Sequence, residues 1–436
     1  MEREFEAIVI GGGPAGATAA ALLARAGWSV ALLEAKRFPR RKVCGECVAA
    51  SNLPLLDALD AGAWRGFAGP ELRSVAIWRG PDRIAAPLPS RPGAGEPWGR
   101  AMGREHLDSL LLDCARAAGV RVLQPCRAHA IHGRPGKLSC EVEVGGRDTP
   151  LTLSAPLLIG AYGSWETPPL GLEGRRPARR AGELLAFKAS FGNAHVPRGV
   201  LPVLSFPGGY GGMVDSGDRT TLACCIRRET LARCRMQSRG ASAGEAVERY
   251  LRLECQGVAD ALRAAVRLGP WLAAGPVRPA VRLRRAPTHA FLIGNAAGEA
   301  HPIIGEGISM ALQSAWLLCR LLVESGDALR TGPGAEDRQR ALQARYRARW
   351  RAHFGARLHL AAGFAHAAMR PGLSSPLVAL LRRAPALLTL GASLSGKTRS
   401  AVSPEACAAP WPAARGGPVS PASVGALPRA LSGPHS

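Results

Sequence analysis

Short apolar runs alternate with helical stretches over the first 125 residues, in the order expected of a parallel α/β unit. An apolar run covers residues 7–10, an Ala- and Leu-rich stretch follows and stops at Gly27, and a second apolar run covers 29–33. Leucines spaced for one helix face then fill 104–118, and residues 120–123 are mostly apolar again. Because strands and helices alternate, the pattern predicts three parallel strands with helices packed against their sheet.

The central part of the chain has the period of two that is typical of strands. Residues 128–153 alternate apolar and polar side chains, which predicts a β-meander, and the apolar run 155–160 predicts a buried strand that returns to the first sheet. We predict a separate sheet-rich domain over 166–279 that also takes part of 64–100. Its strands are expected near 184–191, 200–205 and 220–227, and its amphipathic helix over about 241–254.

The last third of the chain returns to an α/β pattern and ends in helices. An apolar strand within 290–295 precedes a long helix over about 302–325, and further helices reach about residue 395. Residues 401–436 are mainly Pro, Ala, Ser and Gly, so we expect disorder there. The predicted fold class is therefore α/β, with a Rossmann-like domain, an inserted β-rich (mixed-sheet) substrate domain and C-terminal helices. The predicted bounds are 1–165 with 280–330, 166–279, and 331–400, followed by the tail.

The charge composition limits the classes of binding partner that we expect. The formal net charge is +23, but 51 of the 56 basic residues are Arg and they are spread along a chain rich in Ala, Gly and Pro. No basic stripe interleaved with aromatic side chains is present, so no nucleic-acid partner is expected. A diffuse positive field suits an anionic substrate, an acidic redox partner or an anionic membrane surface.

Cysteine usage and hydropathy bear on the compartment. Eleven cysteines in a chain of 436 residues are expected to be reduced thiols, and no spacing typical of a metal site occurs, so no metal is expected. The first strand begins near Phe5, which leaves no room for a signal peptide, and no uncharged apolar run reaches the roughly 18 residues of a membrane span. We expect a cytoplasmic protein with at most peripheral membrane contact. The amphipathic stretch 358–394 is expected to pack against the α/β domain, and contact with a membrane or with the mouth of an apolar substrate site is the alternative.

The first strand leads into the glycine pattern G-x-G-x-x-G. Gly11 permits a tight turn, Gly13 lets backbone N–H groups approach a diphosphate, and Gly16 lets the helix lie close to the strand. Glu34 ends the second strand, where a carboxylate can accept hydrogen bonds from a ribose. Strand, turn, helix, strand and acid agree, so we predict a dinucleotide site. The predicted contacts are Gly11, Gly13, Pro14, Ala15, Gly16 and Glu34.

A second glycine-bearing segment lies near residue 300. A buried strand ends at Gly294, and Pro302 begins a helix that is expected to carry Gly305 and Gly307 in its first turn. Small residues there allow a flat ring to lie against the backbone, and the helix N-terminus can stabilise negative charge on a reduced flavin. The predicted flavin contacts are Gly294, Asn295, Pro302, Gly305, Gly307 and Ile308.

The two segments together resemble the flavoprotein superfamily of the p-hydroxybenzoate-hydroxylase-type monooxygenases, the geranylgeranyl reductases and the flavin-dependent halogenases. The resemblance covers about residues 4–325 and implies FAD as the cofactor. The family Asp of the second segment is Asn295 here, an amide that keeps one hydrogen bond but not the charge. Arg104 matches a family Arg near the FAD phosphates or ribityl chain. Tyr162 replaces an Asp of many hydroxylases that is implicated in NADPH binding, so the reductant stays open between NADPH, NADH and ferredoxin, with an electron-donor protein as a candidate partner.

Two boxes of the geranylgeranyl reductases are partly present. Lys42–Gly45 (K-V-C-G) resembles their K-x-C-G-G box, which implies that Cys44 and Gly45 lie near flavin and substrate. Pro207 and Tyr210 keep half of a lipid-pocket box, which makes Tyr210 the candidate substrate contact. The W-x-W-x-I-P signature of the halogenases is absent, which disfavours halogenation.

The candidate catalytic residues are Cys44 and His301, and each has an alternative. Cys44 and Cys47 form a C-x-x-C that suits a dithiol relay, a single reactive Cys44, or two loop thiols that only pack near the ring. His301 precedes the flavin-facing helix, where it can donate a proton or cap the structure. The expected function is an FAD-dependent oxidoreductase acting on a hydrophobic small molecule, in the first place a monooxygenase that hydroxylates an apolar or aromatic metabolite. The alternatives are a reductase of C=C bonds in a prenyl or lipid substrate, a flavin-linked dithiol enzyme and a non-catalytic flavin-binding module.

Overall fold

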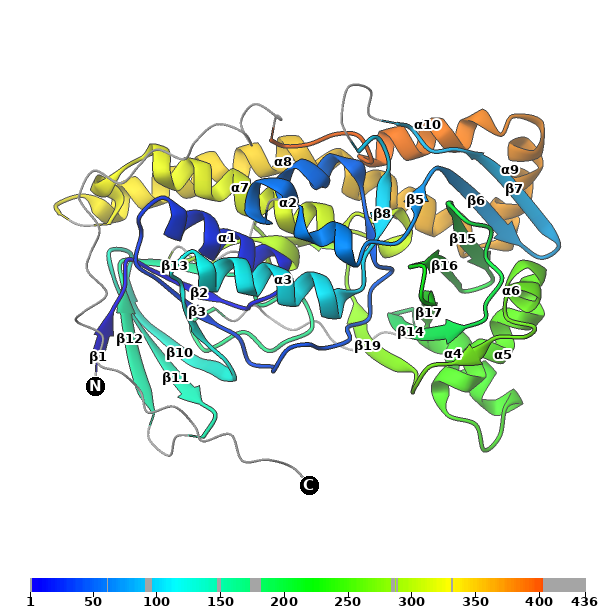
Figure 1. The fold of residues 1–436 in the computed structure, drawn as a ribbon, viewed down its shortest axis with the longest axis horizontal. Helices are drawn as coiled ribbons and strands as arrows, with labels where there is room; N and C mark the ends of the chain where they lie inside the picture. The colour runs from blue at the N-terminus through cyan, green and yellow to red at the C-terminus, as the bar shows by residue number, and fades with distance from the viewer. Residues whose placement is uncertain are drawn as a thin grey trace.

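A parallel sheet of five strands organises the N-terminal half of the protein, as the apolar runs predict (Figure 1). The computed structural model describes residues 2–60, 62–90, 96–146, 150–172, 182–283, 287, 289–330 and 332–402. The strand order is β21–β13–β2–β3–β9, and every neighbouring pair is parallel. In chain order the bounds are β2 Ala7–Ile10, β3 Val30–Leu33, β9 Arg121–Leu123, β13 Leu157–Gly160 and β21 Phe291–Leu292.

Helices cover one face of this sheet and a smaller sheet covers the other (Figure 1). The helices are α1 (Pro14–Arg25), α2 (Leu53–Asp60), α3 (Arg104–Ala117) and α7 (Gly307–Glu324). The predicted meander is confirmed, and its order is β1–β12–β11–β10. Its strands are β1 Glu2–Glu4, β10 Cys126–Arg134, β11 Lys137–Val144 and β12 Leu151–Ala155. Alanine and glycine let α1 pack closely, so it is buried over most of its length between the sheet and its neighbours α3 and α7.

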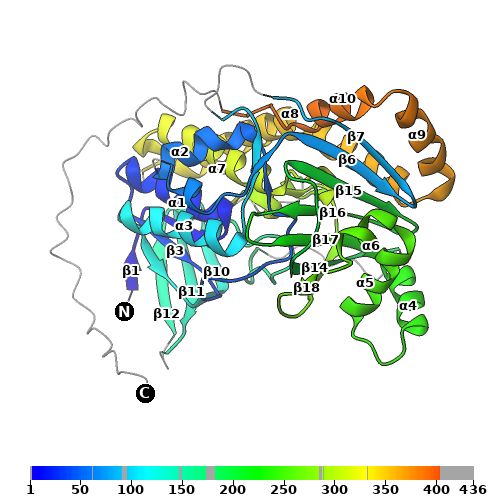
Figure 2. The same cartoon turned by 45° about the vertical axis from the view of Figure 1, so that its right-hand side comes forward.

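A mixed sheet of eight strands forms the second part of the structure, as predicted. Its order is β18–β14–β17–β16–β15–β6–β7, with β19 paired to the outer side of β14, and β15 and β6 are parallel. The bounds are β6 Ser74–Arg79, β7 Asp82–Pro87, β14 Leu184–Gly192, β15 Val200–Phe206, β16 Gly209–Asp215, β17 Thr220–Arg227, β18 Val266–Arg267 and β19 Leu272–Val277. Helices α4 (Arg228–Gln237), α5 (Ala243–Glu254) and α6 (Gln256–Ala261) flank it (Figure 2).

Strand β16 was not among the expected strands, because its glycines weaken the β signal. The same glycines are needed by the sheet: a Cβ on Gly211 would lie 2.7 Å from the Ala223 carbonyl oxygen and 2.8 Å from Cys224 Cβ. Two short sheets complete the strands. They are β4 (Cys47–Val48), β8 (Gly99–Ala101) and β5 (Glu71–Leu72), and β20 (Ala280–Val281) with β22 (Gly298–Glu299).

Three helices end the described chain: α8 (Ala335–Ala368), α9 (Pro371–Arg383) and α10 (Ala386–Ser395). They lie along the top edge of the molecule in both ribbon views, with α9 and α10 at its end (Figures 1 and 2). Within the described chain, no single helix has the length and hydropathy to cross a membrane, and one pair, α9 with α10, meets that test jointly but is bent by 115°. Most of the predicted tail, residues 403–436, lies outside the described residues.

Candidate functional site

The glycine turn after β2 has the geometry that its sequence predicts. Gly11 has a φ of +106°, and a Cβ there would lie 2.6 Å from the carbonyl oxygen of Ala161. A Cβ on Gly16 would lie 1.8 Å from the carbonyl oxygen of Gly11, so the helix can approach the strand only without a side chain. A Cβ on Gly13 would instead meet only an Arg104 guanidinium nitrogen, at 3.9 Å, and α1 has no side-chain cap. The first N–H groups of α1 are therefore free of a capping side chain where an anion can approach.

Glu34 closes β3 beside this turn and is 4% exposed. Its carboxylate accepts hydrogen bonds from the backbone N–H groups of Gly12 and Lys36, both at 2.8 Å, and lies 3.6 Å from Arg40. These bonds hold the carboxylate in place, and its oxygens keep lone pairs that can accept from a ribose.

The second glycine segment differs from the predicted continuous helix. Pro302 begins a single 3₁₀ turn, Pro302–Ile304, and α7 begins only at Gly307. Gly305 has a φ of +62°, which stops the turn because a left-handed residue cannot continue a right-handed helix. Gly305 is thus not in the first turn of α7, and that part of the prediction is wrong. The N-terminus of α7 still lines the same cavity as that of α1.

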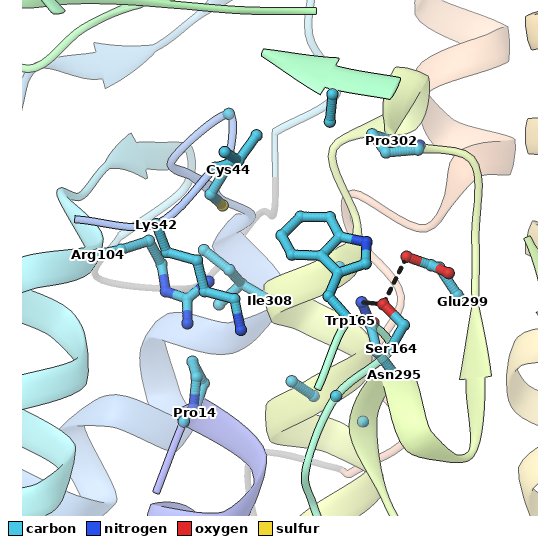
Figure 3. A pocket seen from close by; sticks show the side chains of 18 of the residues that line it. Pro14, Lys42, Cys44, Arg104, Ser164, Trp165, Asn295, Glu299, Pro302 and Ile308 are labelled. Atoms are coloured by element: carbon cyan, nitrogen blue, oxygen red, sulfur yellow. Dashed lines mark hydrogen bonds between the residues drawn. The ribbon is translucent and has the colours of Figure 1, made fainter. Parts of the chain in front are cut away.

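Asn295 lies in a polar chain at one wall of the cavity (Figure 3). Its side-chain amide donates to the Ser164 hydroxyl at 3.5 Å, and that hydroxyl donates to Glu299 at 2.8 Å. Arg282 pairs with Glu299 at 2.9 Å and donates to the Asn295 carbonyl at 2.6 Å. A buried acid, Glu299, thus lies four residues after Asn295 and is linked to it through the Ser164 hydroxyl.

Positive charge gathers at the opposite wall. Arg104 begins α3 and is held by Asp108 through two hydrogen bonds of 2.7 Å, which fixes the guanidinium toward the cavity. Lys42 lies beside it (Figure 3), and burial, together with the charges of Arg104 and Arg40, lowers the pKa of its ammonium to about 8. Each of these cations can bind a phosphate group.

The loop between Cys44 and Cys47 is tied down by a residue that the sequence analysis missed. Glu46 is fully buried and has a φ of +57°. Its carboxylate pairs with Lys188 of β14 and accepts from the Thr221 hydroxyl at 2.7 Å and from the Arg104 backbone N–H at 3.0 Å. The available signal was the single Lys in the apolar strand 184–192 of a chain with five Lys.

A second buried cluster supports the start of α7 from behind. Glu306, the residue before the helix, is 3.1 Å from Lys397 and 3.8 Å from Arg357. Lys397 is also 3.9 Å from the Cys47 sulfur. Burial raises the pKa of the Cys47 thiol, so the thiolate that a dithiol relay needs is disfavoured, although the dithiol hypothesis stays a prediction.

His301 and Tyr210, predicted separately, meet at the wall of the cavity that β16 forms. The Tyr210 hydroxyl and His301 Nδ1 are 3.1 Å apart, a hydrogen bond in which the hydroxyl donates when that nitrogen carries no proton. Burial lowers the pKa of His301 to about 4 and raises that of Tyr210 well above its ordinary value. Both groups are therefore neutral near pH 7.

This pair predicts a pH dependence of folding. The folded protein resists protonation of His301 down to about pH 4, whereas an unfolded histidine takes up its proton near 6.5. The free energy of unfolding of the wild type should therefore fall relative to that of His301→Asn as the pH falls from 6.5 toward 4. Above pH 6.5 the difference between the two free energies should stay constant. Urea unfolding of the FAD-free proteins across this range measures the difference, and parallel curves throughout would contradict the burial of a neutral imidazole.

All of the predicted contacts named so far, with the exception of Gly16 and Pro207, line one cavity of about 290 Å³. Cys44, Gly45, Arg104, Pro302 and Ile308 meet there although they come from distant parts of the chain. In Figure 3 the indole ring of Trp165 lies between Lys42 on one side of the cavity and Ser164 on the other. Among the described residues, the buried Trp165 Nε1 has no hydrogen-bond partner.

The residues of this cavity fit FAD. Two helix N-termini lack side-chain caps, Gly307 faces open space, and Gly13 has only the Arg104 guanidinium near it. Together with the Arg104 and Lys42 cations, these features suit a diphosphate and a flat ring. Glu34 is placed for the ribose of the adenosine half. Of the residues that the structure describes, no group of three or more His, Cys, Asp or Glu side chains is placed to hold a metal ion.

Comparison with known proteins agrees with this fit. A menaquinone reductase of Mycobacterium tuberculosis is 31% identical over 139 residues, which cover 30% of this chain and 32% of that protein. The chain thus aligns with only about a third of the length of this curated relative. The myxobacterial chondrochloren halogenase has a TM-score of 0.68 at 19% identity, with 90% of this chain and 91% of that chain covered.

A geranylgeranyl bacteriochlorophyll reductase-like protein of Thermoplasma acidophilum has a TM-score of 0.62 at 17% identity and covers 90% of this chain and 100% of its own. Both structural likenesses establish the fold alone. Residues 4–331 match the sequence profile of a protein family described as FAD binding domain. This match confirms the prediction that FAD is the cofactor. The chain belongs to the FAD binding domain family.

Proposed function

We propose that the protein is an FAD-dependent oxidoreductase that reduces a carbon–carbon double bond in an apolar, isoprenoid-type substrate. When bound and reduced, FAD supplies a hydride. The observation that carries the proposal is the placement of Lys42–Gly45, which brings Cys44 into the cavity wall beside the Arg104 guanidinium. That segment resembles the K-x-C-G-G box of the geranylgeranyl reductases. The name of the curated relative, menaquinone reductase, also supports a reduction.

The substrate end of the cavity suits an apolar chain. Strands β15 and β16 supply apolar side chains, among them Leu201, Val203 and Val214, and Ile303 faces them from the second glycine segment. The polar groups at this end are Tyr210 and His301, both neutral at pH 7. A neutral hydroxyl can give a proton to one carbon of the double bond while the other receives the hydride. The substrate would gain two hydrogen atoms in this way, and His301 would pass a proton from solvent back to Tyr210.

The identity of residue 162, a tyrosine, bears on which reductant the protein uses. Burial raises the pKa of its phenol to about 12, so it carries no charge where the hydroxylases of the superfamily that the chain resembles have an Asp. This favours an electron-donor protein over direct NADPH binding, with ferredoxin as the probe to use first.

Hydroxylation of an aromatic metabolite, the first expectation from the sequence, is the second candidate. The Tyr210–His301 hydrogen bond favours it, because a neutral imidazole at 3.1 Å from a tyrosine hydroxyl can take up a proton relayed from a phenol. Halogenation has support from similar sequences too, among them a tryptophan 2-halogenase of Chondromyces crocatus that is 33% identical over 128 residues. We rank it lower because the tryptophan signature of the halogenases is absent from this chain.

The experiment mixes photoreduced holoprotein with an unsaturated polyprenyl quinone in detergent without oxygen. We expect flavin reoxidation, and after air exposure a product that keeps two additional hydrogens in its chain, since a quinol ring would return to the quinone. Cys44→Ser should slow reoxidation at least about tenfold (about 1.4 kcal/mol), and Cys234→Ser, a buried thiol in α4 outside the cavity, should not. Reoxidation that requires oxygen and adds an oxygen atom to an aromatic substrate would establish the hydroxylase instead, and reaction with neither would indicate a binding module.

A further inference from the structure

An apolar face with no partner in the described chain lies on α9 and α10. Six leucines on these two short helices are between 37% and 54% exposed, whereas Val378 and Leu381 on the opposite side pack against Ile84 of β7. The leucines are Leu373, Leu377, Leu380, Leu387, Leu390 and Leu394. Exposed apolar side chains gathered in this way mark a surface that contacts something other than water.

The neighbouring charge is positive. Arg345 and Arg349, four residues apart and so on one face of α8, are exposed, and Arg383 is exposed at the end of α9. Among the described residues, none of these three arginines pairs with an acidic side chain. Helix α10 runs back along α8, since Gly391 lies against Phe364 and Gly396 against Arg357. The end of α10 contacts Arg357 of α8, and Arg349 lies eight residues before it, about 12 Å further along the helix axis. Both ribbon views place the three helices on one edge (Figures 1 and 2).

We propose that this edge docks on a bilayer that contains anionic lipid, with the leucines at the acyl boundary and the arginines at the headgroups. A second copy of the chain is a poorer occupant, because a symmetric contact would bring the arginines of both copies together. The helices lie in the interface rather than cross it: 13 and 10 residues give about 20 and 15 Å, against a hydrocarbon core of about 30 Å. The bend of 115° between the two helices also prevents a continuous span.

The docking edge is joined to the substrate end of the cavity. The Gly208 N–H donates to the Met369 carbonyl at 3.0 Å, and the Ser205 hydroxyl donates to the Ala368 carbonyl at 2.8 Å. Met369 also shares an apolar cluster with Tyr210. The residues that lead into α9 thus contact β15 and the turn that joins it to β16, two strands that line the cavity, which suits an apolar substrate drawn from lipid.

Co-sedimentation of the full chain with phosphatidylcholine vesicles, with and without phosphatidylglycerol, tests the proposal. We expect binding to the anionic vesicles that weakens with salt and falls at least about tenfold in Leu377→Glu/Leu390→Glu. Arg345→Gln/Arg349→Gln should remove most of the preference for anionic lipid, at about tenfold or more. Leu253→Glu, at an 84% exposed leucine of α5 away from this edge, is the matched control and should bind like the wild type.

Two results would overturn the docking proposal. One is vesicle binding that the leucine variants leave unchanged while their FAD content shows that they are folded. The other is a concentration-dependent dimer, seen by analytical ultracentrifugation, that Leu377→Glu/Leu390→Glu dissolves, since the face would then belong to a second copy. Vesicle binding needs no turnover, so its failure can be told apart from failure of the proposed reduction.

Discussion

Gly13→Ala is expected to weaken FAD binding at least about tenfold, or about 1.4 kcal/mol, while leaving the FAD-free protein as stable as the wild type. Gly13 has a φ of −70°, which alanine adopts without strain, and the nearest atom to an added Cβ is an Arg104 guanidinium nitrogen at 3.9 Å. The methyl group enters space that only a ligand would fill, the place where the diphosphate approaches the first turn of α1. Fluorescence titration of the FAD-free protein with FAD measures the affinity, and thermal unfolding measures the fold.

Gly16→Ala is expected to lower the stability of the FAD-free protein itself, in contrast to Gly13→Ala. Its Cβ would lie 1.8 Å from the Gly11 carbonyl oxygen and 3.0 Å from Ala161 Cβ, so α1 must move away from β2. Overpacking of this kind costs about 1–3 kcal/mol or more, and the FAD-free protein itself should unfold more easily. Gly355→Ala in α8 is the matched control: nothing lies within 4 Å of its added Cβ, and alanine in a helix is favoured over glycine by about 0.5–1 kcal/mol. Equal loss of FAD-free stability in the Gly13 and Gly16 variants would refute the separate roles.

Local sequence patterns were sufficient to predict the parallel sheet of the FAD binding domain. The run 7–10 became β2 with the predicted bounds, and the helix that the glycines open became α1 (Pro14–Arg25). These elements have clear periods and glycine positions set by contacts a few residues away, which sequence reasoning can follow. The sequence made His301 and Tyr210 separate candidates, but it did not predict that their side chains would contact each other.

The rest of the site depends on contacts that no local pattern encodes. The 3₁₀ turn at Pro302 ends because Gly305 adopts a left-handed conformation, and the sequence alone allows that glycine to be helical as well. The pairing of Glu46 with Lys188 joins a loop residue to a strand residue 142 positions away. Lys397 reaches Glu306 from beyond the last helix. Each of these charges is buried by tertiary packing, which a single sequence does not reveal.

The buried pair of Glu46 and Lys188 leads to the second large effect. Lys188→Met should destabilise the protein by about 3–5 kcal/mol, because it leaves a buried carboxylate without its counter-charge. Lys188 is 1% exposed and Glu46 fully buried, so water cannot take the place of the lost partner. Glu46→Gln should cost a comparable amount by leaving the ammonium unpaired. Lys137→Met, at an exposed lysine of β11, removes the same charge from the surface and should change the free energy of unfolding by less than about 0.5 kcal/mol.

The double variant Glu46→Gln/Lys188→Met separates the ion pair from the loop geometry. A glutamine keeps one acceptor oxygen for the Arg104 N–H, and its NH2 group can donate to the Thr221 hydroxyl, which accepts as well as donates. A methionine fills the space of the lysine stem, so most of the lost stability should return. Urea unfolding of the four proteins in the cycle gives the coupling free energy, and FAD titration shows whether the loop of Cys44 has moved. If Lys188→Met unfolds at the same free energy as the wild type, Glu46 does not need its partner. If instead the double variant regains stability but binds FAD weakly, the charge pair also sets the position of the loop that faces the flavin.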